Sequence, residues 1–356
     1  MSGLNRPPDN HVFEFSKEDI DLTFDRPLFR DLISSKAFKR LHDIYFLGGI
    51  DYLVPASSKR IRRNNRYQHT LAVAALAKRY VMSSEISDSD ADKIIAAALL
   101  HDIGHAPLSH SMEPAFRKHY GVDHHRIGRE IILGNGCDGG EVSGILSRYG
   151  VDPVSIIGLI EGDEIVESAD IFSRSINVDT IEGIIRSSRY IHGGVFLNPS
   201  LVLDSMRLLD RSSLRVLDAF WRLKNEVYSG LIQSMKGTVA DMICIAYMEG
   251  NKNDFSEDDY FSTGTRFRRY HSSLLYDLSE YGARGVVPDY VMPIIADMKV
   301  FRRRFTVQED VLLRSASDLD KRYTQEKVSA KISMDVFKRR GGEWNAIIKP
   351  GQGVFE

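Results

Sequence analysis

The chain has 356 residues, of which 43% are hydrophobic and 27% charged, and its formal net charge is −2. This length and hydrophobic content predict a globular protein with one large domain and a second lobe. The near-neutral charge offers no global attraction to nucleic acid or to a membrane surface, so only local charge can indicate such partners.

Neither export nor membrane insertion is expected. The first residues lack the apolar core of a signal peptide, and the longest aliphatic run, residues 94–100, is far below the about 20 residues of a membrane span. The two cysteines, Cys137 and Cys244, provide neither a disulfide framework nor a thiolate metal cluster. We therefore expect a cytoplasmic protein with no membrane partner.

Helical periodicity dominates the chain, while strand alternation is scarce. Apolar residues recur at helical spacing in residues 28–47, 69–81, 91–103, 124–133, 154–160, 179–191 and 212–248, the last forming one or two helices. Short hairpins would fit near residues 48–55 or 193–197. The fold class predicted is therefore all-α, or mostly α. A more polar stretch after about Asn251 predicts a division into a first domain, residues 1–250, and a mainly helical C-terminal lobe, residues 251–356.

Histidine is concentrated in one part of the chain, with seven of the eleven histidines lying between His69 and His125. His101 and Asp102 end an apolar helix, His69 opens an earlier one and Asp179 opens a later one. Imidazole and carboxylate together suit a divalent transition metal. We predict that His69, His101, Asp102 and Asp179 bind Mn, Fe, Zn, Ni or Co, or less favourably Mg. The other His-Asp pair, His42 and Asp43, has no such neighbours and is interpreted as structural.

The order of these motifs resembles that of the HD-domain phosphohydrolases, and within them the deoxynucleotide triphosphohydrolases, which include bacterial dGTPases and the vertebrate SAM-and-HD-domain enzyme. The resemblance runs from about Phe29 to Met248 and rests chiefly on residues 66–73, RYQHTLAV, and 100–110, LHDIGHAPLSH. It implies an HD-domain helical fold with the metal-ligand set given above.

The resemblance also implies roles for residues around the metal. Histidines that follow the metal pair in the family contact phosphate or act in acid catalysis, and they correspond to His105, His110 and His125, or its neighbour His124. Glu113 would orient His110, unless it is an exposed acid at a helix start. Arg66 would bind substrate phosphate, because its planar fork matches phosphate oxygens; the alternative is a surface arginine paired with an acid.

Two features depart from the triphosphohydrolases. Asp179 is followed by Thr-Ile-Glu-Gly, where the family usually has a lysine and a tyrosine that hold the triphosphate and sugar. Tyr228 or Lys236 would supply a nucleotide contact instead, the alternatives being ordinary packing and a solvated charge. The basic segment 59–66 would bind a polyanion such as single-stranded nucleic acid, or form a solvated surface. A second basic cluster, residues 301–305, is interpreted as surface or partner contact.

The resemblance favours hydrolysis of a dNTP to deoxynucleoside and triphosphate, in a homo-oligomer with a nucleotide activator. A nuclease or cyclic-nucleotide phosphodiesterase is the first alternative, favoured by the basic segment and the missing lysine and tyrosine. A non-enzymatic nucleotide sensor is the second, and the intact metal-ligand set argues against it.

Overall fold

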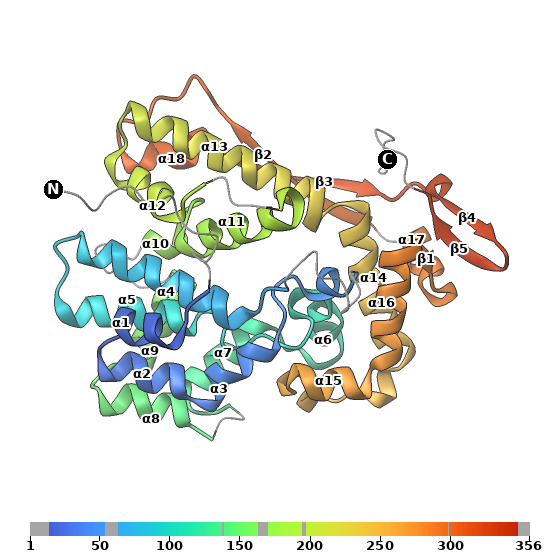
Figure 1. Cartoon of the computed structure of the whole chain (residues 1–356), viewed down its shortest axis with the longest axis horizontal. Coiled ribbons are helices and arrows are strands. Elements are labelled where there is room, and N and C mark those ends of the chain that lie inside the picture. Colours follow the sequence, from blue (N-terminus) through green and yellow to red (C-terminus); the bar gives the residue numbers. More distant parts are fainter. Residues whose placement is uncertain are drawn as a thin grey trace.

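A computed structural model of the chain describes residues 14–53, 63–136, 139–162, 170–193, 197–297 and 299–347. Helices dominate this part of the chain, and the prediction of a mostly α fold is confirmed (Figure 1). In the described residues, no helix combines the length and the apolar character that crossing a membrane requires.

The N-terminal helices are shorter than the periodicity predicted. They are α1 (Lys17–Thr23), α2 (Pro27–Ser34) and α3 (Lys36–Arg40). The single helix predicted over residues 28–47 is wrong, because Ser35 has an extended backbone that ends α2. The Ser35 hydroxyl then accepts a hydrogen bond from the Phe38 amide and starts α3. At the first predicted hairpin, residues 48–55, the described part forms a 3-10 helix, Gly48–Tyr52, in place of strands. Most of the second predicted hairpin, residues 193–197, lies outside the described residues.

The central helices form the core beneath the histidine cluster. They are α4 (Arg66–Met82), α5 (Asp88–Leu100), α6 (Glu113–Tyr120), α7 (His124–Leu133), α8 (Glu141–Arg148) and α9 (Pro153–Glu161). Every residue of α5 from Ile94 to Leu100 is buried, since this helix is enclosed by α4, α9 and α2. Such all-round burial fixes the helix end at which His101 and Asp102 lie.

The next helices cover the other side of the C-terminal end of α5. They are α10 (Asp170–Ser173), α11 (Val178–His192), α12 (Pro199–Leu208), α13 (Arg211–Val227) and α14 (Met235–Gly250). Asn177 caps α11 by accepting a hydrogen bond from the Thr180 amide at 2.7 Å, which places Asp179 in the first turn. A π-helical turn, Tyr228–Ile232, separates α13 from α14, so the segment predicted over residues 212–248 forms two helices.

The C-terminal region contains strands that the sequence did not predict. Its helices are α15 (Gly264–Tyr270), α16 (Ser272–Arg284), α17 (Met292–Asp297) and α18 (Leu319–Arg322); its strands are β1 (Val286–Val287), β2 (Lys299–Val307), β3 (Tyr323–Lys331), β4 (Phe337–Arg340) and β5 (Glu343–Ala346). Antiparallel pairing gives a β2–β3 hairpin and a small β1-β5-β4 sheet. The hairpin returns to α13, where the Trp221 indole donates to the Thr306 carbonyl at 3.1 Å. The division near residue 250 stays a prediction.

Gly104 lets the loop after α5 meet α7 closely. A Cβ atom at this position would lie 2.1 Å from the His124 carbonyl oxygen and 2.4 Å from the Gly128 amide nitrogen. These are backbone atoms, so neither can move without moving α7. The glycine therefore sets the distance between His101–Asp102 and His124.

We predict that Gly104→Ala lowers the free energy of unfolding by about 1–3 kcal/mol, the usual cost of overpacking. Gly144→Ala is the matched control, because Gly144 is exposed in α8 and its added Cβ would meet nothing within 4 Å. That change should raise the free energy of unfolding by up to about 1 kcal/mol, through helix propensity. Urea denaturation followed by circular dichroism measures both, and equal stabilisation by the two substitutions would contradict the close approach.

Candidate metal centre and histidine cluster

Three predicted metal ligands converge from three different helices. His69 lies in the first turn of α4, His101 caps the end of α5 and Asp179 lies in the first turn of α11. The Asp179 Oδ1 atom is 3.1 Å from His69 Nε2 and 3.8 Å from His101 Nε2. Both Nε2 atoms are buried without a hydrogen-bond partner in the described part of the chain. The three ligand atoms enclose a space that suits a cation.

Asp102 adjoins this space but also serves a second partner. Its Oδ2 atom lies 3.4 Å from His69 Nε2 and 3.7 Å from His101 Nε2. The same oxygen accepts a hydrogen bond of 2.6 Å from the Arg66 guanidinium. Burial raises the pKa of the Asp102 carboxyl, but Arg66 and the neighbouring histidines outweigh burial and hold it well below its usual range. Asp102 is therefore ionised, as a metal ligand must be.

Hydrogen bonds at Nδ1 fix how both histidines face the space. His101 Nδ1 donates to the Ala98 carbonyl at 2.8 Å, and His69 Nδ1 donates to the Glu182 carboxylate. With the proton on Nδ1, each Nε2 lone pair is free to coordinate, which is the usual arrangement of metal-bound histidine.

Glu182 is in turn held in place by hydrogen bonds from buried side chains. The Arg186 Nε atom donates to Glu182 Oε1 at 2.8 Å, and Arg186 Nη1 donates to the Asn64 side chain at 3.0 Å. Glu182 and Arg186 are completely buried. Sequence reasoning did not assign Glu182 or Arg186, although Glu182 lies one helical turn after Asp179 and so had a visible spacing signal.

The electrostatics of the space between the predicted metal ligands favour a cation. Burial lowers the pKa of His101, but the carboxylates of Asp102 and Asp179 outweigh burial and raise it to about 9. A divalent ion would displace that proton and meet the same negative charge. The unpartnered Nε2 atoms and the mixed nitrogen and oxygen donors fit a divalent transition metal.

A second cluster lies beside the first and consists of His105, His110, Glu113 and His124. Glu113 Oε2 accepts hydrogen bonds from His124 Nδ1 at 2.9 Å and from His110 Nδ1 at 3.2 Å. Burial raises the pKa of Glu113, but these two hydrogen bonds outweigh it and bring the pKa below its ordinary value. Glu113 is thus a buried, ionised acid that orients two imidazoles, rather than an exposed acid at a helix start.

His105 joins the two clusters. Its ring stacks on His124 with centroids 4.2 Å apart, and its Nε2 atom is 3.1 Å from Asp102 Oδ1. Burial, with Arg66 and His124 nearby, holds the pKa of His105 well below its ordinary value. This ring is therefore neutral at physiological pH.

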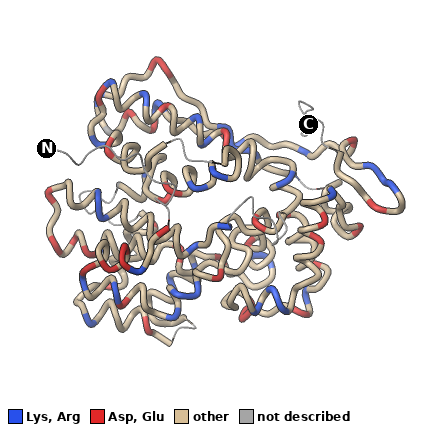
Figure 2. Tube along the Cα trace, in the orientation of Figure 1, with Lys and Arg blue, Asp and Glu red and all other residues tan. Residues whose placement is uncertain are grey.

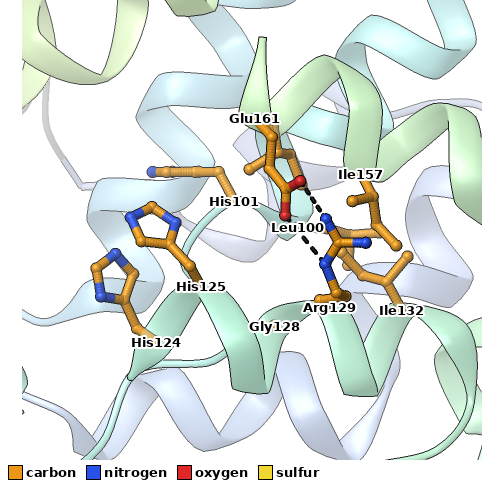
Figure 3. Close-up of a pocket in the computed structure, with 10 residues that line it drawn as sticks. Leu100, His101, His124, His125, Gly128, Arg129, Ile132, Ile157 and Glu161 are labelled. Carbon is orange, nitrogen blue, oxygen red and sulfur yellow. Dashed lines mark hydrogen bonds and ion pairs between the residues drawn. The ribbon is translucent and has the colours of Figure 1, made fainter. Parts of the chain in front are cut away.

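His125 lines a pocket next to both clusters (Figure 3). Its ring centroid is 3.9 Å from that of His124. Figure 3 shows His101, His124 and His125 on one side of the pocket and the ion pair of Arg129 with Glu161 on the other. Of His124 and His125, it is His124 that forms the hydrogen bond with Glu113.

Arg66, which was predicted to bind substrate phosphate, forms hydrogen bonds within the protein instead of facing an open site. Its guanidinium is buried and donates to Asp102, to the Ser109 hydroxyl at 3.0 Å and to the Phe46 carbonyl at 3.2 Å. These contacts position Asp102. The alternative of a surface arginine is wrong, because Arg66 is buried and the acid paired with it, Asp102, adjoins the metal centre.

Tyr228 is half-buried, whereas Lys236 is exposed in the first turn of α14. Tyr228 begins the π-helical turn, four residues after Lys224 of α13, and the Asp179 carboxylate acts on the pKa of both groups. Lys224 is buried, with its ammonium 4.4 Å from the Trp221 ring centroid and 3.2 Å from the Ser175 carbonyl. Sequence reasoning missed Lys224, although its spacing of four residues from Tyr228 places both on one helix face.

The basic segment 59–66 lies partly outside the described residues, which begin again at Arg63. The Arg63 guanidinium lies 5.3 Å from the Tyr45 ring centroid and donates to the Asp51 carbonyl at 2.8 Å. The other His-Asp pair is explained by packing. His42 stacks on Tyr67 with centroids 3.4 Å apart, and Asp43 pairs with Arg268.

Comparison with known proteins matches this region to one family. The model of the HD domain matches residues 66–147, which contain both the His101–Asp102 pair and the second cluster. This match supports a relationship to the HD-domain phosphohydrolase superfamily.

Curated relatives include the uncharacterized protein YwfO of Bacillus subtilis, which is 32% identical over 169 residues, 45% of this chain and 36% of that protein. The deoxynucleoside triphosphate triphosphohydrolase SAMHD1 homolog of Dictyostelium discoideum is 27% identical over 221 residues, 56% of this chain and 39% of the relative. The Bos taurus deoxynucleoside triphosphate triphosphohydrolase SAMHD1 is 36% identical over 123 residues, 33% and 18% of the two chains. This chain spans less than half the length of each relative.

We predict that Glu182→Gln raises the dissociation constant for Mn²⁺ roughly 10- to 100-fold, the usual effect of losing a partner of a ligating histidine. The matched control is Glu309→Gln, which removes the same charge from an exposed ion pair with Arg222. Isothermal titration of metal-free protein measures affinity, and a thermal melt measures stability. Unchanged affinity with a lower melting temperature would assign Glu182 to the fold alone.

Proposed function

We propose that the protein is a metal-dependent phosphohydrolase acting on nucleotides, and specifically a dNTP triphosphohydrolase. The observation that carries the proposal is the convergence of His69, His101, Asp102 and Asp179 with two uncommitted Nε2 atoms. The two SAMHD1 relatives, whose names specify deoxynucleoside triphosphate hydrolysis, support this choice of substrate.

The metal centre would be held by these four residues. A divalent transition ion bound there would polarise a phosphoryl oxygen and lower the pKa of a bound water. Asp179 is the ligand nearest to solvent, with its side chain 54% exposed. Substrate therefore reaches the centre from the side of α11 on which Asp179 lies.

The second cluster would handle protons and phosphate. We assign His110 as the group that protonates the leaving oxygen, because its side chain is 63% exposed and its Nδ1 atom is held by Glu113. An ionised carboxylate behind an imidazole fixes its tautomer and supports its proton transfer. His125, which lines the pocket, would contact phosphate oxygens. His105 is completely buried against Asp102 and His124, and it would hold these two groups in place.

Lys224 and Tyr228 would replace the lysine and tyrosine that are missing after Asp179. Lys224 lies on α13 and Tyr228 begins the π-helical turn that follows it, and Asp179 acts on the pKa of both groups. Lys224 has no carboxylate partner in the described part of the chain and is bonded to one carbonyl. A buried ammonium without a counter-ion is costly, and a substrate phosphate would offset that cost. The homo-oligomer, the nucleotide activator and the cytoplasmic location stay predictions.

With Mn²⁺, we expect the purified protein to release triphosphate and deoxynucleoside from dNTPs, and Asp102→Asn to lower kcat/KM at least about 100-fold, through loss of a metal ligand. Asp43→Asn is the matched control, since it alters the other His-Asp pair, and should retain most activity. The assay runs dNTPs beside NTPs, cyclic dinucleotides and single-stranded DNA. Cleavage of the last two alone would favour the nuclease or phosphodiesterase alternative, and nucleotide binding without turnover would favour the sensor.

A dependence on pH should identify Lys224. Burial lowers the pKa of Lys224 to about 8, Arg303 adds to this effect and Asp179 opposes it. The ammonium is charged below that pH and neutral above it, so kcat/KM for a dNTP should fall as pH rises through about 8. Lys224→Arg stays charged and should not show this fall below pH 9. Identical pH profiles for the two proteins would exclude Lys224 as a phosphate ligand.

A further inference from the structure

We propose that one face of the β2–β3 hairpin binds the backbone of single-stranded nucleic acid. This face, here called the basic face, carries Lys299, Phe301, Arg303, Lys327 and Lys331. The proposal concerns binding alone and does not depend on the proposed hydrolysis.

The strand register gathers these side chains on one side. Lys299 is directly opposite Lys331, Phe301 is opposite Ser329 and Arg303 is opposite Lys327. Directly opposed residues, and alternate residues of one strand, point to the same face of a sheet. Four cations thus share a face, and none of the residues opposed along Lys299–Arg303 is acidic. The other face carries Arg304 opposite Glu326.

The cations are available to a ligand. All four are exposed, and none forms an ion pair with a carboxylate in the described ranges of the chain. Like charges directly opposite one another weaken a strand pair, so Lys299 with Lys331 and Arg303 with Lys327 cost stability. A bound polyanion would reverse that cost.

An aromatic ring lies within the row of charge. Phe301 is 51% exposed, and the Lys327 ammonium lies 4.3 Å from its ring centroid. Proteins that bind single strands without sequence preference combine a basic track with aromatic rings on which bases stack. Phe301 supplies the ring and the four cations supply the track.

Shape favours a single strand over both a nucleotide and a duplex. The row from Lys299 to Arg303 extends about 13 Å, at about 3.3 Å per residue, which suits a linear chain of phosphates. The hairpin cannot enter a duplex groove, because side chains from α13 and the segment after it form hydrogen bonds with the edge of β2 that does not pair with β3. Gln233 bonds the amide of Arg303 at 2.7 Å and the carbonyl of Phe301 at 3.2 Å, and Asn225 accepts from the Phe305 amide at 3.2 Å.

The basic face reaches the π-helical turn after α13. The Arg303 guanidinium donates to the Tyr228 hydroxyl at 3.4 Å and lies 5.7 Å from the Tyr228 ring centroid. Basic residues along this hairpin are marked in Figure 2, and Figure 1 shows the hairpin passing over α13. A strand on this face would therefore run up to the turn that joins α13 to α14.

The test is fluorescence anisotropy of a labelled 20-nucleotide oligo-dT with the full chain, in EDTA so that the probe is not hydrolysed. Phe301→Ala should weaken binding roughly 5-fold or more, through loss of base stacking. Lys327→Gln with Lys331→Gln should weaken it further and reduce the salt slope by about 0.7 for each lost phosphate contact. Arg304→Gln is the matched control, because it removes one charge from the same strand but from the opposite face, and it should bind like the unchanged protein.

A circular-dichroism melt of each variant separates lost binding from lost folding. Absence of binding by the unchanged protein at 50 mM salt would overturn the proposal. So would equal weakening by Arg304→Gln, or equal affinity for a duplex of the same length. A change in oligomeric state on light scattering, with DNA affinity unchanged, would instead assign the basic face to contact with a second copy of the chain.

Discussion

The hydrogen bond from His69 to Glu182 is the constraint on which the metal centre depends. It joins α4 to α11 across the buried interior, and Arg186 holds its acceptor in place. Because His69 is fixed from behind, its Nε2 atom faces Asp179 without a partner of its own. Helices distant in the chain thus deliver rigid ligands, and rigidity is what makes a donor set selective for a cation.

Asp102 couples this centre to the second histidine cluster. One of its oxygens faces His69 and accepts from Arg66, while the other faces His105. His105 then stacks on His124, which is bonded to Glu113. A change of charge in one cluster therefore affects the other, because buried charges such as those of Asp102 and Glu113 are screened weakly.

The sequence was informative where chemistry follows local spacing. Helix periodicity located α4, α5, α7 and α11, so it also placed His69, His101 and Asp179 near helix ends. The partners of those ligands depend on contacts between distant segments, which is why Arg186 and Lys224 were missed. Strand β2 was not predicted because only one of its nine residues, Phe305, is buried, and a strand with so little burial shows no regular alternation of polar and apolar residues.

The π-helical turn Tyr228–Ile232 between α13 and α14 has a geometric consequence. Each residue of an α-helix advances the side-chain direction by about 100°, whereas a π turn winds more slowly. The turn therefore sets the angle between the face of α13 that carries Lys224 and the face of α14 that packs on α16. The number of residues in this turn therefore determines the angle between the two faces. A homologue with one residue fewer would point the two faces in different directions.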